Sequence, residues 1–183
     1  MFELFKTKAE AVNAEVHRFA GKSPALDFIR ETFRAEGVAD TPESYAVWTD
    51  CPFLDGVDKD ELVKEFPGLK FGVTRDLAGK AKIGVTQMHW ALADTGTVVQ
   101  NSTDPKERLA SSLTWIHLAI LDTGAILPDM QALLETVHPK DAAYLALISG
   151  PSRTADIERV LTIGVHGPER LIIVCIDDLG GHN

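Results

Sequence analysis

The sequence predicts an α/β fold with a Rossmann-like, mostly parallel sheet covered by helices on both faces. In the second half of the chain, continuous apolar runs of strand length alternate with segments of helical periodicity. Strands that are apolar throughout are typical of parallel sheets buried on both faces, and helical connections imply right-handed crossovers. The length of 183 residues and the 45% hydrophobic content are sufficient for one good core.

The amino-terminal segment is predicted to be helical. From Phe2 to Ala20, apolar residues recur every three or four positions and define one face of an amphipathic helix. A break at Gly21–Pro24 is followed by a second helix to about Ala35. We therefore expect residues 1–37 to form a helical segment that packs on an α/β domain spanning residues 38–183. The first helix would pack on that domain or mediate self-association.

Short strands and helices follow toward the centre of the chain. Apolar runs bounded by turn residues predict strands, and runs with helical spacing predict helices. The expected elements are a strand at Tyr45–Trp48, a helix at Lys59–Phe66, and strands at Lys70–Thr74 and Ile83–Thr86.

The second half continues the alternation with clearer boundaries. Two apolar pieces separated by a Thr-Gly turn are expected to pair as strands, and later apolar runs are expected to be buried strands of the sheet. The expected elements are paired strands at Trp90–Asp94 and Thr97–Gln100, helices at Pro105–Ser112 and Pro128–Val137, and strands at Trp115–Leu121, Ala142–Ile148 and Leu171–Ile176.

Composition limits the classes of function. The formal net charge of −9 argues against sequence-independent binding to nucleic acid or to an anionic membrane, because both need a basic surface. No apolar run is long enough to span a bilayer and no secretory signal is evident, so we expect a cytoplasmic protein without membrane insertion. The two cysteines, Cys51 and Cys175, and the spacing of the six histidines encode no disulfide framework and no metal site.

The segment Ser149–Glu158 is the most informative part of the chain. It reads Ser-Gly-Pro-Ser-Arg-Thr-Ala-Asp-Ile-Glu and lies between an apolar run and a helix-like segment. Free backbone N–H groups and the helix dipole at a helix start favour an anion, but the same residue types are also typical of a helix cap. Both interpretations stay open. An anion site here would use Ser149, Gly150, Ser152 and Arg153.

Other candidate residues lie in loops of the predicted sheet. Ligands of open parallel sheets bind outside the carboxyl ends of the strands, so we expect site residues after Ile148, after Leu121 and around residues 94–97. The sequence Asp94-Thr95-Gly96-Thr97 combines a carboxylate and two hydroxyls with a glycine. It would form part of a ligand site, with Asp94 as a candidate general base, or a turn that binds its own backbone.

Three further side chains have two interpretations each. His117 interrupts an apolar run and is either a candidate catalytic residue or a satisfied core histidine. Arg108 and Arg153 would face an anionic ligand or form ordinary surface ion pairs. The spacing reveals no nucleophile, base and orienter triad, and no glycine-rich nucleotide motif is present.

The segment Ser149–Glu158, followed by Gly164-Val165-His166-Gly167-Pro168, resembles the LUD-domain proteins of the lactate-utilisation C family. The segment Ala93–Val99 is similar to the Ala-Glu-Thr-Gly-Thr segment of that family, and His117 matches its histidine within an apolar strand. The resemblance covers about Lys70 to Asp178. At Asp94 the family has glutamate.

This resemblance implies a fold similar to the superfamily of sugar-phosphate isomerases and coenzyme A transferases. It also implies a role in the oxidation of L-lactate to pyruvate, together with a cysteine-rich iron–sulfur partner and a larger LUD-containing partner. We expect an accessory or ligand-binding component that binds a small anionic ligand and no cofactor directly. The iron–sulfur clusters are expected only in the partner proteins.

Two other classes of function stay open at this point. One is a stand-alone enzyme that binds a phosphorylated or coenzyme A-linked small molecule, as members of the wider superfamily do. The other is a non-catalytic interaction protein that keeps the fold and has lost the ligand, which the aspartate at position 94 and the unusual segment Gln87–Trp90 favour.

Overall fold

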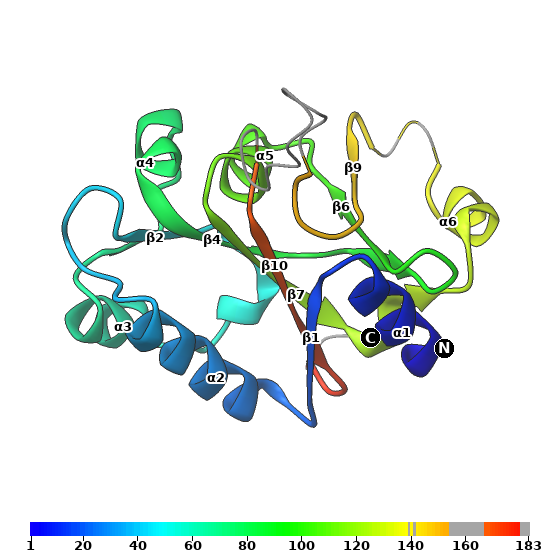
Figure 1. The fold of residues 1–183 in the computed structure, drawn as a ribbon, viewed down its shortest axis with the longest axis horizontal. Coiled ribbons are helices and arrows are strands. Elements are labelled where there is room, and N and C mark those ends of the chain that lie inside the picture. The colour runs from blue at the N-terminus through cyan, green and yellow to red at the C-terminus, as the bar shows by residue number, and fades with distance from the viewer. Residues whose placement is uncertain (139, 141, 154–166, 180–183) are drawn as a thin grey trace.

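The computed structural model of the protein describes residues 1–138, 140, 142–153 and 167–179. The helix expected after the Ser149 turn would lie in residues 154–166, outside the described residues. The other elements form two sheets and the helices that cover them (Figure 1).

The main sheet has six strands, and all of its neighbouring pairs are parallel. The order across the sheet places β10 and β7 in its interior, each between two neighbouring strands, where their continuous apolar runs are buried on both faces. The predicted α/β class with a parallel sheet is therefore confirmed. In spatial order the strands are β1 (Glu15–Phe19), β10 (Arg170–Ile176), β7 (Ile116–Asp122), β4 (Ala81–Gln87), β2 (Tyr45–Trp48) and β3 (Leu69–Lys70).

The first element of the chain differs from the expected helix over residues 2–20. Helix α1 covers only Phe2–Ala11, and the residues after it turn into β1, which pairs with β10. Asn13 has a φ of 69°, a left-handed conformation that asparagine tolerates and that a right-handed helix excludes. The turn at Asn13 ends the helix and sends the chain into the sheet as an edge strand.

A second, smaller sheet packs on the main one. In its order of four strands, β5 pairs antiparallel with β6, as predicted, and parallel with β8. The apolar run before Ser149 forms the edge strand β9, antiparallel to β6 and partly exposed, and not a buried strand of the main sheet. The strands in spatial order are β8 (Ile126–Leu127), β5 (Trp90–Leu92), β6 (Thr97–Asn101) and β9 (Leu145–Ile148).

Helices cover both faces of the main sheet (Figure 1). On one face lie α2 (Lys22–Ala35) and α3 (Lys59–Glu65). The other face is covered by α1, the second sheet, α4 (Arg75–Gly79) and α5 (Pro105–Ser112), while α6 (Met130–Thr136) packs on the outside of the second sheet. Over the described part of the chain, no helix has the length and hydropathy needed to cross a bilayer.

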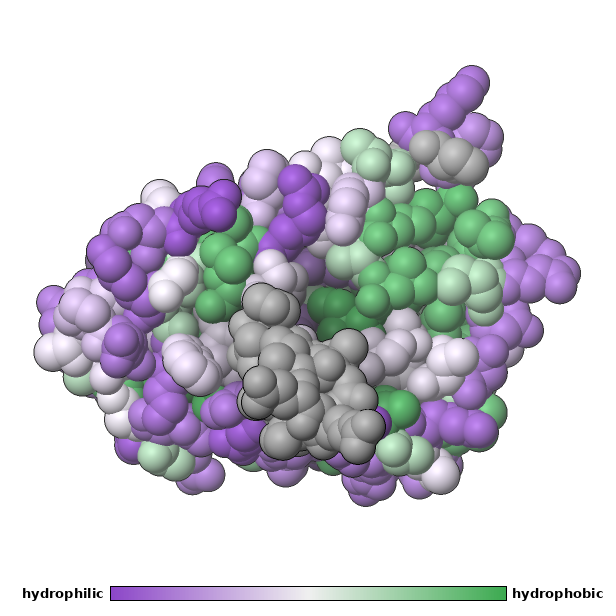
Figure 2. All heavy atoms as spheres, turned by 45° about the horizontal axis from the view of Figure 1, so that its top comes forward, coloured by the Kyte–Doolittle hydropathy of each residue, from purple (hydrophilic) through white to green (hydrophobic). Residues whose placement is uncertain are grey.

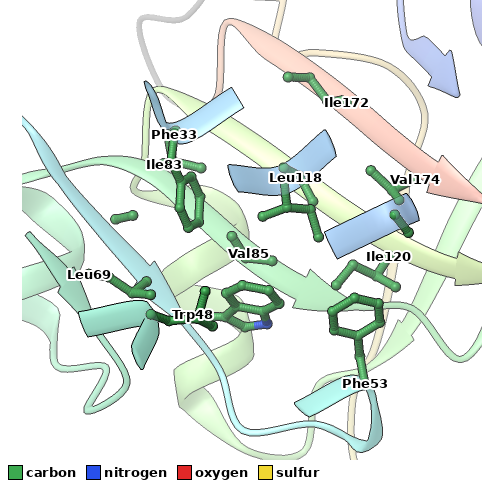
Figure 3. Close-up of a cluster of buried hydrophobic side chains, with 14 of the residues drawn as sticks. Phe33, Trp48, Phe53, Leu69, Ile83, Val85, Leu118, Ile120, Ile172 and Val174 are labelled. Carbon is green, nitrogen blue, oxygen red and sulfur yellow. The ribbon is translucent and has the colours of Figure 1, made fainter. Parts of the chain in front are cut away.

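The largest cluster of buried side chains lies between the main sheet and the α2–α3 face (Figure 3). Trp48 is fully buried at its centre, with its ring 5.7 Å from that of Phe53 and 6.1 Å from that of Phe33. Isoleucine, leucine and valine side chains of β4, β7 and β10 complete it. Because this face is filled by side chains, it holds the sheet rigid beneath the site on the opposite face.

Candidate functional site

A pocket of about 280 Å³ lies on the second face, where the Ser149 turn meets the beginnings of β7 and β10. The strands contribute His117 and Leu171, and the carboxyl end of α5 contributes two serines. The remaining walls come from the segments on either side of residues 154–166. The lining residues are Ser111, Ser112, His117, Leu147, Ile148, Ser149, Gly150, Pro151, Ser152, Gly167, Pro168 and Leu171.

Hydroxyl groups join the two sequence motifs next to this pocket. The Oγ1 atom of Thr97 lies 2.7 Å from Oγ of Ser149 and 2.8 Å from Oγ1 of Thr95. Thr97 is buried at the start of β6, and Ser149 follows the end of β9, so the antiparallel pairing of the two strands brings these hydroxyls together. The Thr95–Thr97 turn and the Ser149 turn, which both carry predicted site residues, therefore lie next to each other.

Two glycines allow both turns to approach the end of α1. Gly96 has a φ of +66°, and a Cβ atom there would lie 2.2 Å from the backbone nitrogen of Ala9. Gly150 has a φ of +73°, and its Cβ would lie 2.2 Å from the carbonyl oxygen of Val12. Side chains at these positions would meet backbone atoms, so both turns need glycine to pack against the end of α1.

Ser152 fixes the far side of the Ser149 turn. Its backbone N–H donates to the carbonyl oxygen of Pro168 at 2.7 Å, which ties the turn to the loop that leads into β10. Gly167 lies so close that a Cβ there would be 2.9 Å from Cβ of Ser152. Among the described residues, the Ser152 hydroxyl has no hydrogen-bond partner, so it is available to a ligand in the pocket.

His117 is the most deeply buried polar residue of the pocket. Its side chain is 1% exposed, and its Nε2 atom lies 2.8 Å from Oγ1 of Thr86 on the neighbouring strand β4. Burial lowers the pKa of His117 to about 3, so the ring is neutral near pH 7. Nδ1 of the same ring is buried and has no partner in the part of the chain that the structure describes.

Gly84 explains how α5 reaches this part of the sheet. It is the register partner of His117, and a Cβ at Gly84 would lie 1.9 Å from the carbonyl oxygen of Ala110. The absence of a side chain lets α5 pack directly on β4. This close packing brings Ser111 and Ser112, at the end of α5, to the pocket that His117 lines.

Three predicted site residues lie outside this group. Arg108 donates to the carbonyl oxygen of Ser102, and its guanidinium lies 4.7 Å from the centre of the Tyr144 ring, so it links α5 to the segment before β9. Asp94 is exposed on the turn before Thr95 and does not line the pocket. Arg153 is exposed directly after Ser152 and has no ion pair among the described residues.

The site also lies at a different edge of the sheet than expected. The loop after Ile148 was expected at the carboxyl ends of the parallel strands, but it meets the amino-terminal ends of β7 and β10. The reason is that β9 belongs to the second sheet, where it runs antiparallel to β6. Of the three loops in which site residues were expected, only the one after Leu121 lines a pocket at the carboxyl edge.

A second pocket, of about 250 Å³, occupies that carboxyl edge. Burial, and to a smaller extent the nearby Asp104, raises the pKa of Glu107 to about 7, and burial lowers that of His89. Sequence reasoning missed most of these residues because they come from four separate loops and from α5, although the expected edge was a signal for Asp122. The lining consists of Asp50, Cys51, Pro52, Gln87, Met88, His89, Glu107, Asp122, Ala125 and Leu179.

The described residues include no cluster of three or more His, Cys, Asp or Glu side chains that could hold a metal ion. Both cysteines are free thiols. Burial raises the pKa of Cys51 to about 11 and that of Cys175 to about 12, so both thiols are protonated at neutral pH and are poor metal ligands in this state.

Comparisons with known proteins agree with these motifs. The family model described as LUD domain matches residues 2–176. Lactate utilization protein C of Halalkalibacterium halodurans is 37% identical over 107 residues, which cover 55% of this chain and 46% of the relative. Lactate utilization protein C of Macrococcus caseolyticus is 32% identical over 142 residues, covering 72% and 60%. The chain spans about half the length of the curated relatives it matches.

The fold is also found in a solved structure. The crystal structure of a DUF162 family protein from Deinococcus radiodurans aligns with a TM-score of 0.64, covering 96% of this chain and 95% of that protein. The sequence identity of 16% limits this likeness to the fold.

Proposed function

Because this chain belongs to the LUD domain family, we propose that it is an accessory, ligand-binding component of an L-lactate utilisation system that acts with iron–sulfur partner proteins. The observation that carries the proposal is the identity of 32–37% to relatives named lactate utilization protein C. The matched relatives are longer than the aligned segments, so a role in lactate utilisation is our proposal for this chain.

The pocket next to Ser149 supports the ligand-binding part of the proposal. It combines polar atoms of His117, Ser149 and Ser152 with apolar side chains in a space large enough for a small molecule. Arg153, which follows directly, supplies a positive charge that no described acidic residue neutralises. These groups suit a small anionic ligand.

The need for partners follows from the redox chemistry of lactate oxidation, which removes two electrons. A four-iron cluster takes four thiolate ligands, and this sequence contains two cysteines. Clusters that accept these electrons would therefore need ligands from outside this sequence, and we place them in iron–sulfur partner proteins.

An apolar surface supports association with such a partner. Figure 2 shows apolar surface gathered on the side of the molecule where β6, β9 and α6 lie in Figure 1. Tyr144, directly before the edge strand β9, is 51% exposed, and Leu147 within this strand is 45% exposed. Leu134 on α6 is 61% exposed. Exposed apolar groups of this kind are typical of protein interfaces.

The proposal is tested in the native host. Deletion of the gene should impair growth on L-lactate but not on glucose, and anaerobic affinity purification of the tagged chain should recover iron–sulfur proteins with their visible absorbance. A matched strain that carries Leu134→Asp tests the interface, because a charge on this exposed face of α6, away from both pockets, should reduce recovery of the partners. Normal growth of the deletion strain on lactate, together with recovery of the chain alone, would refute the proposed function.

A further inference from the structure

The contact between Thr86 and His117 bears on which nitrogen of the imidazole carries the proton. The Thr86 side chain is fully buried, and Nε2 of His117 is the one hydrogen-bond partner that its hydroxyl has among the described residues. A hydroxyl that donates to Nε2 places the imidazole proton on Nδ1. With the opposite tautomer, the Thr86 proton and the Nδ1 lone pair would both be buried without a partner, which is the more costly arrangement.

The resulting N–H group on Nδ1 belongs to a residue that lines the pocket. Nε2 is held by β4, so Nδ1 lies on the other edge of the ring, where no described residue accepts its proton. Buried polar groups are nearly always hydrogen-bonded, and an unpaired one at a pocket wall needs a ligand or a water molecule. His117 thus presents a neutral donor, because burial opposes the charged form of the ring.

The rest of the lining limits the ligand chemistry. The Ser152 hydroxyl is a second donor without a described partner, and the Ser149 hydroxyl is a third polar group at the same turn. Leu147, Ile148 and Leu171 form an apolar wall, and none of the described lining residues is charged. Arg153 follows Ser152 but does not line the pocket, and it adds one positive charge next to the turn. One such charge beside neutral donors and apolar side chains matches a monovalent carboxylate with a short carbon chain better than a doubly charged phosphate.

We propose that His117, as the neutral tautomer with its proton on Nδ1, and Ser152 together bind the carboxylate oxygens of a short-chain carboxylic acid in this pocket, with Thr86 as the positioning residue for the imidazole. This inference rests on the ligand-binding part of the proposed function and names the class of its ligand. In this role His117 donates a hydrogen bond and does not transfer a proton.

The tautomer is tested without a ligand. Two-bond nitrogen–proton correlation spectra of protein with ¹⁵N-labelled histidine distinguish Nδ1–H from Nε2–H, and His117→Gln assigns the signal. We expect the Nδ1–H tautomer and no titration of His117 between pH 5.5 and 8. Thr86→Val, which removes the donor at nearly constant shape, should shift the ¹⁵N pattern of the ring. An Nε2–H tautomer, or titration within this range, would overturn the inference.

Ligand binding is tested by calorimetry with pyruvate, propionate and inorganic phosphate. We expect the two carboxylates to bind and phosphate to bind at least about tenfold more weakly. The side-chain amide of His117→Asn can occupy the region of Nδ1, while that of His117→Gln occupies the region of Nε2. Asn should therefore retain more affinity, and Gln should lose about tenfold or more.

Ser152→Ala serves as the second variant, because it leaves the contact between His117 and Thr86 intact, and should also weaken carboxylate binding by about tenfold. Preferential binding of phosphate, no binding of either carboxylate, or equal affinity of wild type, His117→Gln and Ser152→Ala would overturn the ligand assignment. These results do not depend on lactate growth or on partner recovery, so failure of this inference and failure of the proposed function can be distinguished.

Discussion

The hydroxyl oxygens of Thr97 and Ser149 lie 2.7 Å apart, although the two residues are 52 positions apart in the sequence. This contact joins the start of β6 to the turn after β9, beside the pocket that Ser149 lines. A partly buried hydrogen bond between side chains contributes on the order of 1 kcal/mol to folding.

A double-mutant cycle measures this contact. Thr97→Val and Ser149→Ala should each lower the free energy of unfolding by about 1 kcal/mol, and the double variant should lose less than the sum because the contact is lost only once. Urea unfolding monitored by circular dichroism provides the values. Thr136→Ala, on the exposed side of α6, is a control whose cost should stay below about 0.5 kcal/mol. Full additivity would show that the two hydroxyls are not coupled.

Gly150 should tolerate no side chain. Gly150→Ala combines an unfavourable φ of +73° with a Cβ atom 2.2 Å from the carbonyl oxygen of Val12, so we expect a loss of on the order of 3 kcal/mol. Gly56 offers a matched control, since it has the same φ and a Cβ there would meet nothing within 4 Å, and Gly56→Ala should cost about 1 kcal/mol. Thermal and urea unfolding compare the two, and equal losses would contradict the packing of this turn against α1.

Glu107 should make stability depend on pH near neutrality. Its folded-state pKa of about 7 lies above the unfolded value of about 4.3, so the folded state binds the proton more tightly and loses stability as pH rises from about 4 to 7. Glu107→Gln removes this loss and should be more stable than wild type at pH 8, by on the order of 1 kcal/mol, but not at pH 4.5.

Urea unfolding at the two pH values tests this. The exposed Glu31→Gln on α2 should change stability by less than about 0.5 kcal/mol at either pH. A gain for Glu107→Gln that is equal at both pH values would rule out titration of Glu107 as its cause.

The main sheet could be predicted because interior strands that are buried on both faces have continuous apolar sequences. β7 and β10 are apolar at almost every position, as strands covered on both faces must be. The edge strand β1 has one neighbour and carries Glu15, His17 and Arg18, so its apolar residues also fit a helical spacing. The asparagine at position 13 was the available sequence signal for the left-handed turn that ends α1, but asparagine occurs in many other settings.

The sequence identified several residues that line the candidate pocket, but it did not predict the edge of the sheet where the pocket lies. His117, Ser149, Gly150 and Ser152 do line one pocket. The run before Ser149 is as apolar as β7, yet it forms a partly exposed edge strand, because hydrophobicity alone does not specify the sheet to which a strand belongs. Nδ1 of His117 has no partner among the described residues because of how the side chains around it pack, and a local sequence pattern does not contain that information.

Arg170 and Glu36 form an ion pair that links β10 to the end of α2. The Nη1 atom of Arg170 lies 2.6 Å from the Glu36 carboxylate, its Nε lies 2.7 Å from Glu15, and Nζ of Lys82 lies 2.9 Å from Glu36. This network connects β1, β4 and β10 with the end of α2. Burial alone would raise the pKa of Glu36, but the hydrogen bonds from Lys82 and Arg170 outweigh it, so the pKa is lowered.

A lowered pKa means that the ionised Glu36 stabilises the fold above the unfolded pKa of about 4.3 and that this contribution is lost as pH falls below it. Glu36→Gln should therefore cost about 1–2 kcal/mol at pH 7 and progressively less toward pH 3, as measured by urea unfolding. Asp40→Asn breaks a more exposed pair with Lys70 and should cost less than about 0.5 kcal/mol at pH 7. A loss for Glu36→Gln that does not change between pH 7 and pH 3 would show that its charge does not stabilise the edge of the sheet.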